Sequence, residues 1–308
     1  MALREMDPKT KQLVILSGKG GTGKTCVAAA LAHLASISEP PLRAVLADAD
    51  VDAANLELIS KPRRLDCQPF YGGQTAVIEP NLCSGCGLCS AVCRFDAISS
   101  DNGAFQVNPF ACDGCSACFF QCPENAIKMQ AQTAGEWFQS ESQFGPLFHA
   151  ELTPAQENSG KLVTLIKQQA RLLAMDESRE LVIVDGPPGI GCPVISAASG
   201  ADYALIVTEP SRSGAADLSR VLKTTAHFGI NALVCINKAG LFPPGEIEIE
   251  TLCREQDIPI AGRIPFDPAV VEGMTQAEPV TVYAPQSPAS VAIRAVWSRI
   301  RNILWGYS

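Results

Sequence analysis

The sequence predicts an α/β fold with a mostly parallel sheet and a second, smaller domain inserted into it. Five short apolar segments have the composition of buried strands, at residues 12–17, 43–50, 180–186, 203–209 and 232–238. Helical segments at 160–175 and 214–227 alternate with these strands, which is typical of a parallel sheet covered by helices on both faces. The alternation stops over residues 61–135, which hold most of the thirteen cysteines. We interpret residues 136–159, which return the chain to the first domain, as irregular.

Composition and charge narrow the function classes. The chain has 308 residues, of which 47% are hydrophobic and 18% charged, enough for a substantial core. The net charge of −8 and the lack of a long Lys/Arg run give no reason to expect nucleic-acid binding. No long apolar run and no signal peptide are evident, so we expect a cytoplasmic protein and do not expect membrane binding. Thirteen cysteines in a reducing compartment indicate metal binding rather than disulfides.

Residues 17–25, SGKGGTGKT, have the pattern of a phosphate-binding loop between a strand and a helix. Backbone N–H groups of such a loop bind phosphate oxygens, and the helix N-terminus adds partial positive charge. We expect Lys24 to contact the β and γ phosphates of ATP and Thr25 to bind Mg²⁺. The predicted nucleotide contacts in this segment are Gly18, Lys19, Gly20, Gly21, Thr22, Gly23, Lys24, Thr25 and Cys26.

The cysteine pattern C-x₂-C-x₂-C-x₃-C occurs twice, starting at Cys83 and again 29 residues later at Cys112. This is the spacing of bacterial ferredoxins with two [4Fe–4S] clusters, in which the fourth cysteine of each motif ligates the other cluster. Zinc is the alternative, but a third cysteine at the same spacing and the duplication argue against it. The predicted ligands are Cys83, Cys86, Cys89 and Cys122 for one cluster and Cys112, Cys115, Cys118 and Cys93 for the other.

The two cysteine motifs differ after their last cysteine. The second ends in Cys122-Pro123, as in ferredoxins, whereas the first reads Cys93-Arg94. A cation beside the cluster that Cys93 ligates would favour the reduced form and raise the reduction potential. Alternatively, Arg94 points into solvent and has no effect on the potential. The sequence leaves both interpretations open.

Lys19 lies five residues before Lys24, and this second lysine resembles the deviant Walker A motif of the MinD/Mrp/ParA ATPases, which nitrogenase iron protein shares. In that group the extra lysine reaches across a dimer interface to the partner's nucleotide. The resemblance therefore implies a homodimer, or a heterodimer with a related sister ATPase. It also implies a discontinuous ATPase domain, residues 1–60 and 136–308, with residues 61–135 forming an α+β, ferredoxin-like insertion.

Further segments resemble those of the same ATPases. DADVDAANLELI, from residue 48, resembles switch I, which implies that Asp48 lies near Mg²⁺ and that Asp50 orients the attacking water. LVIVDGPPGIG resembles the Walker B and switch II region, with Asp185 contacting Mg²⁺ directly or through water. INKAG and GRIPFD resemble base-recognition segments, and the residues implied there are Asn237, Pro265 and Asp267. The implied catalytic residues are Lys19, Lys24 and Asp50.

An ATPase of the MinD superfamily with an inserted two-cluster ferredoxin is a recognisable family, and this chain resembles its members. The resemblance implies ATP hydrolysis coupled to electron transfer, or to maturation of an iron–sulfur or mixed-metal cofactor. The partner would be a redox protein or a metal-cofactor protein of the dinitrogenase iron–molybdenum-cofactor type. Alternatively, the chain is a MinD-like positioning or scaffolding switch whose clusters are structural or redox-sensing.

Two features allow two interpretations each. Cys192 follows switch II, where the cysteine of nitrogenase iron protein ligates a cluster shared between subunits; since no second cysteine near the switches is evident, packing as a small apolar residue is the better interpretation. The C-terminal segment from Ser290 has an amphipathic helical pattern, which fits a last core helix or, as in MinD, a membrane-binding helix. Its apolar face consists of Ile293, Val296, Trp297, Ile300, Ile303 and Leu304.

Overall fold

The computed structural model describes residues 10–101, 103–153 and 159–306, and the chain forms two compact units. The first unit contains the described residues up to Gln68, then Trp137–Glu151, and the chain from Ser159 onward. The second contains Pro69–Glu136 together with residues 152 and 153. Two 16-residue strands, β3 (Arg63–Ile78) and β6 (Ile127–Ser142), carry the chain from one unit to the other.

Nine strands of the described residues form one sheet, in the order β11-β10-β9-β1-β8-β2-β7-β6-β3. From β11 to β7, every described neighbouring pair is parallel, which confirms the predicted mostly parallel sheet. All five predicted strands are present. The strands other than β3 and β6 are β1 (Lys11–Ser17), β2 (Ala44–Asp48), β7 (Gly145–Leu152), β8 (Leu181–Pro188), β9 (Tyr203–Thr208), β10 (Asn231–Ala239) and β11 (Ile260–Pro265).

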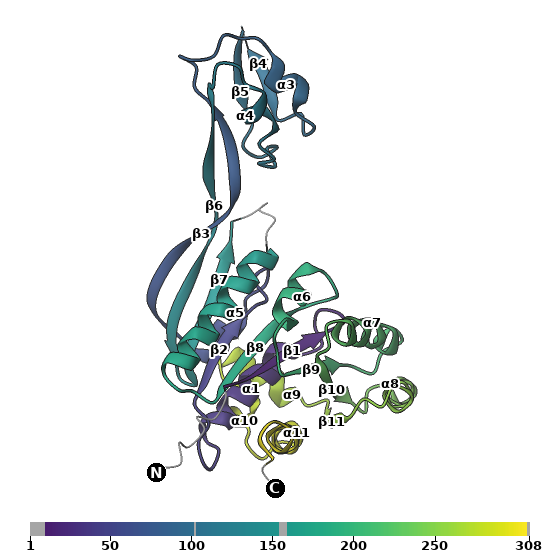
Figure 1. Cartoon of the computed structure of the whole chain (residues 1–308). Helices are drawn as coiled ribbons and strands as arrows, with labels where there is room; N and C mark the ends of the chain where they lie inside the picture. Colours follow the sequence, from purple (N-terminus) through teal and green to yellow (C-terminus); the bar gives the residue numbers. More distant parts are fainter. Residues whose placement is uncertain (1–9, 102, 154–158, 307–308) are drawn as a thin grey trace, which may run out of the picture. The chain divides into compact units, whose positions relative to one another are not determined.

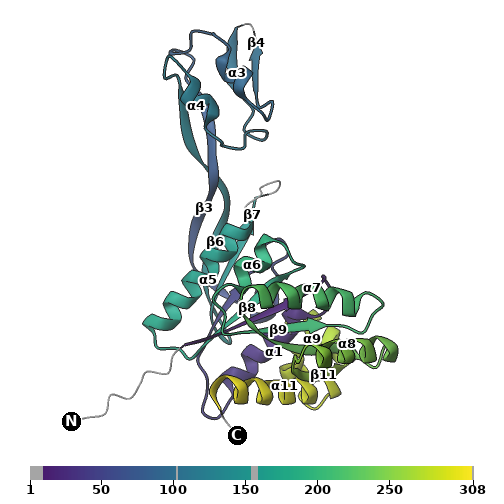
Figure 2. The ribbon, with the colours of Figure 1, turned by 45° about the vertical axis from the view of Figure 1, so that its right-hand side comes forward.

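Helices cover both faces of the sheet in the first unit (Figures 1 and 2). Helices α5, α6 and α7 lie on one face, and α1, α10 and α11 lie on the other. Strand residues such as Leu13, Ile15 and Leu46 are fully buried against the α1 and α11 side. The helices of this unit are α1 (Lys24–Ser36), α2 (Leu56–Ser60), α5 (Ser159–Asp176), α6 (Cys192–Ala198), α7 (Gly214–His227), α8 (Pro243–Glu255), α9 (Pro268–Thr275), α10 (Val280–Tyr283) and α11 (Pro288–Trp305).

The interpretation of residues 136–159 as irregular is wrong for its described part. This stretch contains the end of β6 and all of β7, joined by a tight turn at Gln143 and Phe144. The central residues of β7, 146–150, are buried without interruption. A strand that is covered on both faces lacks the alternation of apolar and polar residues by which a strand is recognised in sequence.

Helix α11 packs into the core of the first unit, as one of the two interpretations of the C-terminal segment predicted. Ile293, Val296, Ile300 and Leu304 are buried, and Ile303 is partly buried against the same cluster. Trp297 is also buried, and its Nε1 donates a hydrogen bond to Ser38 Oγ at 3.0 Å. Among the described residues, no helix is long and apolar enough to cross a membrane.

The second unit repeats one local structure. Helices α3 (Leu88–Val92) and α4 (Ala117–Gln121) contact each other and have the same 29-residue offset as the two cysteine motifs. Strands β4 (Ile98–Asp101) and β5 (Ala104–Val107) form an antiparallel pair. The small core of the second unit contains Ala76, Cys89, Ile98, Cys118 and Ile127.

We predict that Trp297→Ala destabilises the first unit by about 3–5 kcal/mol, because it removes a large buried side chain and leaves Ser38 without its partner. Val291→Ala on the same helix is the control, since this side chain is 53% exposed and should change the stability by less than about 0.5 kcal/mol. Chemical denaturation followed by circular dichroism measures both. Equal stabilities of the two variants would contradict core packing of α11.

Candidate nucleotide and metal sites

The phosphate-binding loop connects β1 to α1 and borders a cavity of about 690 Å³. Gly23 has a φ of 91°, and a Cβ placed there would lie 2.4 Å from Asn237 Nδ2. A Cβ at Gly18 would lie 2.6 Å from the backbone oxygen of Asp217 on α7. Both positions therefore require glycine, Gly23 for its left-handed backbone and Gly18 for close packing of the loop on α7.

Most of the predicted nucleotide contacts come together at this cavity. Three loop residues do not line it: Gly18, which faces α7, and Lys19 and Thr22. Asp48 and Asp185 are fully buried behind it. The predicted residues that line the cavity are Gly20, Gly21, Gly23, Lys24, Thr25, Cys26, Asp50, Asn237, Pro265 and Asp267.

One apolar wall of the cavity is absent from the predictions. Phe266 and the α9 residues Val270, Val271 and Met274 supply it, and Met274 Sδ lies 2.9 Å from Cys26 Sγ. Apolar walls suit the flat face of a nucleotide base. The only signal in the sequence is a short apolar run after Asp267, which by itself does not distinguish a ligand contact from a core contact.

The predicted base-recognition residues also hold the loop in place. Asn237 Nδ2 donates to the carbonyl of Thr22 at 2.7 Å, and Lys238 Nζ donates to the carbonyl of Gly21 at 2.8 Å. The carboxylate of Asp267 accepts the N–H groups of Ala269 and Ala289 at 3.0 and 3.1 Å, so it caps α9. The end of β10 thus holds the phosphate-binding loop, and Asp267 holds the start of α9.

Two carboxylates lie directly opposite each other on neighbouring strands: Asp48, the last residue of β2, and Asp185 within β8. Asp48 accepts the N–H groups of Asp50 and Leu56 at 3.2 and 2.9 Å. Neither oxygen of Asp185 has a hydrogen-bond partner of normal geometry among the described residues. Burial raises the pKa of Asp185 to about 7, although Thr25 and Lys24 lower it, and burial raises the pKa of Asp48 as well.

The arrangement fits a divalent cation bound with the nucleotide. Mg²⁺ prefers oxygen ligands and is usually held by one or two carboxylates together with phosphate oxygens. Asp185 has two buried oxygens without partners, and the Thr25 hydroxyl is close enough to affect its pKa. Both carboxylate oxygens of Asp48 already accept hydrogen bonds from backbone N–H groups. Asp185 is therefore the stronger candidate for a direct ligand of the cation.

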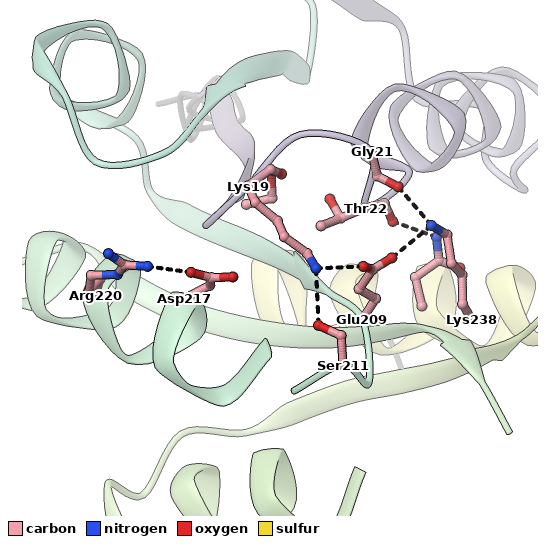
Figure 3. A network of polar contacts seen from close by, with 10 residues as sticks. Lys19, Gly21, Thr22, Glu209, Ser211, Asp217, Arg220 and Lys238 are labelled. Carbon is pink, nitrogen blue, oxygen red and sulfur yellow. Dashed lines mark hydrogen bonds and ion pairs between the residues drawn. The ribbon is translucent and has the colours of Figure 1, made fainter. Parts of the chain in front are cut away.

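Lys19 does not line the cavity, and its side chain points toward Glu209 and Ser211 of its own chain (Figure 3). Its Nζ lies 2.7 Å from Glu209 Oε1 and donates to Ser211 Oγ at 3.0 Å. The other oxygen of Glu209 lies 2.7 Å from Lys238 Nζ. Glu209 therefore pairs with two ammonium groups, and its pKa is lowered by both.

The second unit contains two small cavities, each lined by four cysteines. Each takes three thiols from one motif and the fourth from the other motif. Among the described residues, no group of three or more His, Cys, Asp or Glu side chains is arranged to hold a single metal ion. The cysteines are Cys83, Cys86, Cys89 and Cys122 in one cavity and Cys93, Cys112, Cys115 and Cys118 in the other.

The structure also locates the two ambiguous residues. Arg94 is exposed and does not line the cavity of Cys93, where Phe95 and the carboxylate of Asp113 are found instead. Cys192 is the exposed first residue of α6, so the interpretation that it packs as a small apolar residue is wrong. Its neighbours on both sides, Gly191 and Pro193, line the nucleotide cavity.

Comparison with known proteins identifies the family. The model of the CobQ/CobB/MinD/ParA nucleotide binding domain matches residues 13–280. The chain belongs to this family. MinD and ParA proteins are P-loop ATPases, so the chain is an ATP-binding, MinD/ParA-type ATPase.

Individual relatives agree with this assignment. The uncharacterized protein MJ0578 of Methanocaldococcus jannaschii is 36% identical over 230 residues, which are 75% of this chain and 79% of that protein. The septum site-determining protein MinD of Pyrococcus horikoshii, complexed with Mg-ADP, shares the fold with a TM-score of 0.57 at 20% identity, over 96% of this chain and 98% of that one. The cytosolic Fe-S cluster assembly factor NBP35 of Eremothecium gossypii is 30% identical over 155 residues, 45% of this chain and 46% of that protein.

We predict that Asp185→Asn lowers the Mg²⁺-dependent ATPase rate by about 100-fold, because it removes the charge that the cation requires. Without nucleotide, the same change should raise the stability by about 1–2 kcal/mol, since a buried carboxylate without a partner is costly. Turnover at varied Mg²⁺ and denaturation of the nucleotide-free protein measure the two effects. Asp176→Asn, at an exposed position at the end of α5, is the control. An unchanged Mg²⁺ dependence in Asp185→Asn would exclude Asp185 as a ligand.

Proposed function

We propose that the chain is an ATP-hydrolysing iron–sulfur protein. In this proposal, ATP-driven dimer switching is coupled to electron transfer or to maturation of an iron–sulfur or other metal cofactor. The observation that carries it is the pair of four-cysteine cavities in a chain whose first unit is a MinD/ParA-type ATPase. The similarity to a protein described as an Fe-S cluster assembly factor supports the iron–sulfur part.

The second unit provides two donor sets that suit [4Fe–4S] clusters. In each cavity the fourth thiol comes from the other motif, Cys122 in one and Cys93 in the other, as in two-cluster ferredoxins. The exchanged cysteines also tie the two halves of the repeat together. When bound, such a cluster takes up and releases single electrons. The apolar residues around the cavities, among them Phe105 and Met129, restrict the access of water.

In the first unit, each part of the ATP site has a proposed task. Lys24 binds the β and γ phosphates, while Thr25 and Asp185 hold Mg²⁺. Asp50 lines the cavity and orients the attacking water. Burial raises the pKa of Asp50 above its ordinary value, although the Lys24 ammonium lowers it in part.

Lys19 is proposed to act in a dimer, formed with a second copy of the chain or with a sister ATPase. The support is its position, since it contacts Glu209 and Ser211 and does not line the cavity of its own chain. A lysine outside the cavity of its own chain can serve the nucleotide of a partner. The partner that exchanges electrons or metal with this chain would be a redox protein or a metal-cofactor protein. ATPase rates of the oxidised and reduced protein test the coupling that such a partner requires.

We predict that Cys122→Ser and Cys93→Ser each lower the iron content to about half, because each variant removes one ligand from a different cavity. Iron and sulfide determination, with electron paramagnetic resonance of the reduced protein, measures this. The two variants should lose different signals. Cys253→Ala, at a buried position in α8, is the control and should keep all iron. A wild-type protein that binds zinc in place of iron would contradict the assignment.

Coupling is tested by the ATPase rate of anaerobically purified protein, measured once oxidised and once reduced with dithionite. We expect the two rates to differ by at least about twofold, because in a coupled protein the cluster state changes the relative stability of the nucleotide-bound states. The equilibrium measurement is the reduction potential with ADP and with an ATP analogue, which by linkage shifts as nucleotide binding does on reduction. Equal rates, together with potentials that do not depend on the nucleotide, would overturn coupling and favour a positioning or scaffolding switch.

A further inference from the structure

Helix α2 begins at the buried carboxylate of the ATP site. The backbone N–H of Leu56, the first residue of α2, donates to Asp48 Oδ2 at 2.9 Å. The other oxygen of Asp48 accepts the N–H of Asp50 at 3.2 Å. A change in the position of Asp48 therefore acts directly on the first turn of α2 and on the loop that carries Asp50.

The next residue of α2, Glu57, contacts the strands β7 and β3. Its Oε2 lies 2.9 Å from Nδ1 of His149 on β7 and 3.9 Å from Nη2 of Arg64 on β3. His149 is completely buried, and its Nε2 lies 3.0 Å from Ser140 Oγ on β6. Arg64 also forms an ion pair of 2.7 Å with Glu151 at the end of β7. One carboxylate on α2 is thus connected to three strands.

Ring stacking joins the same three strands. The guanidinium carbon of Arg64 lies 3.9 Å from the centre of the Phe138 ring on β6. Phe138 and His149 stack with ring centres 5.0 Å apart and planes 29° apart. Phe138 is among the largest fully buried side chains of the chain. Such close packing transmits small displacements, because buried rings have little free volume to absorb them.

The C-terminal end of α2 is tied to the turn between β6 and β7. Gln143 Nε2 donates to the carbonyl of Ile59 at 3.1 Å, and the Gln143 backbone N–H donates to the carbonyl of Ser60 at 3.4 Å. Both ends of this five-residue helix are therefore anchored. One anchor is a residue of the ATP site, and the other is the turn from which β6 and β7 start.

The contact between Glu57 and His149 is close but poorly aligned. Burial lowers the pKa of His149 to about 4, so the ring is neutral at physiological pH. Among the described residues its Nδ1 has no hydrogen-bond partner of normal geometry, although Glu57 lies beside it. A displacement of α2 that aligned this pair would give the buried Nδ1 atom a partner, so the contact responds to the position of α2.

We propose that α2 transmits the nucleotide state from Asp48 to β3, β6 and β7, and that Glu57 and His149 are the positioning residues of this joint. β3 and β6 continue into the second unit, which carries the two four-cysteine cavities. The proposal rests on the proposed coupling function and names the route by which the first unit would exert it. Neither residue lines the nucleotide cavity, so their effect is indirect.

The experiment compares amide hydrogen exchange of the full chain bound to Mg-ADP and to Mg²⁺ with a non-hydrolysable ATP analogue. In the wild type, exchange in residues 63–68 and 137–151 is expected to differ at least threefold between the two nucleotides. In Glu57→Gln and in His149→Phe this difference is expected to fall below 1.5-fold, while nucleotide affinity stays within threefold of wild type. A residue with a merely structural role would change exchange equally in both nucleotide states and leave the difference intact.

Glu250→Gln is the matched control, because it breaks an ion pair with Arg263 between α8 and β11 at the other edge of the sheet. It is expected to keep the full wild-type difference. Glu57 is partly exposed, so Glu57→Gln remains informative if His149→Phe fails to fold. A full nucleotide-dependent difference in Glu57→Gln, or none in the wild type, would overturn the α2 route. The proposed coupling function is tested separately, because ATPase rates that do not respond to reduction would overturn it. The hydrogen-exchange measurement does not require bound iron, so the two outcomes can be distinguished.

Discussion

The structure around the phosphate-binding loop depends on two carboxylates buried side by side without a full counter-charge. Asp48 and Asp185 lie opposite each other on neighbouring parallel strands, burial raises the pKa of both, and the charge of Asp185 raises that of Asp48 further. Lys24 reduces this cost only in part. The missing positive charge is the reason that a divalent cation and the loop carrying Thr25 belong at this place. The fold keeps the pair together because the surrounding strands are fully buried and cannot rearrange.

The parallel sheet explains how one chain can hold this site and a large insertion together. The carboxyl ends of parallel strands meet at one edge, so β1, β2, β8 and β10 bring their loops to a common cavity. The inserted sequence begins after α2 and returns through β7, and it adds β7, β6 and β3 at the end of the strand order. The strands that hold the cavity remain neighbours, and the added strands join them where β7 pairs with β2.

Local patterns made much of this predictable. A glycine-rich loop between strand and helix, five apolar strands and two cysteine motifs each need only a few neighbouring residues, and all lie where the sequence indicated. Contacts between distant residues were not predictable. Nothing near Lys19 in sequence indicates Glu209, and His149 has no local signal because it lies in a strand covered on both faces. The apolar wall from α9 was missed because it depends on contacts between residues distant in sequence. The strand β7 was missed because it is covered on both faces and lacks an alternating pattern.

The ion pairs around Glu209 bear on how easily Lys19 can serve a partner. Lys19 and Glu209 are both partly exposed, and pairs of this kind contribute only about 0.2–1 kcal/mol. If Lys19 leaves, Glu209 still pairs with Lys238, so no carboxylate remains without a counter-charge. Lys238 in turn keeps its hydrogen bond to the phosphate-binding loop at Gly21. Breaking the ion pair between Lys19 and Glu209 therefore costs little free energy. A phosphate group of a partner's nucleotide would form a stronger contact with Lys19 than Glu209 does.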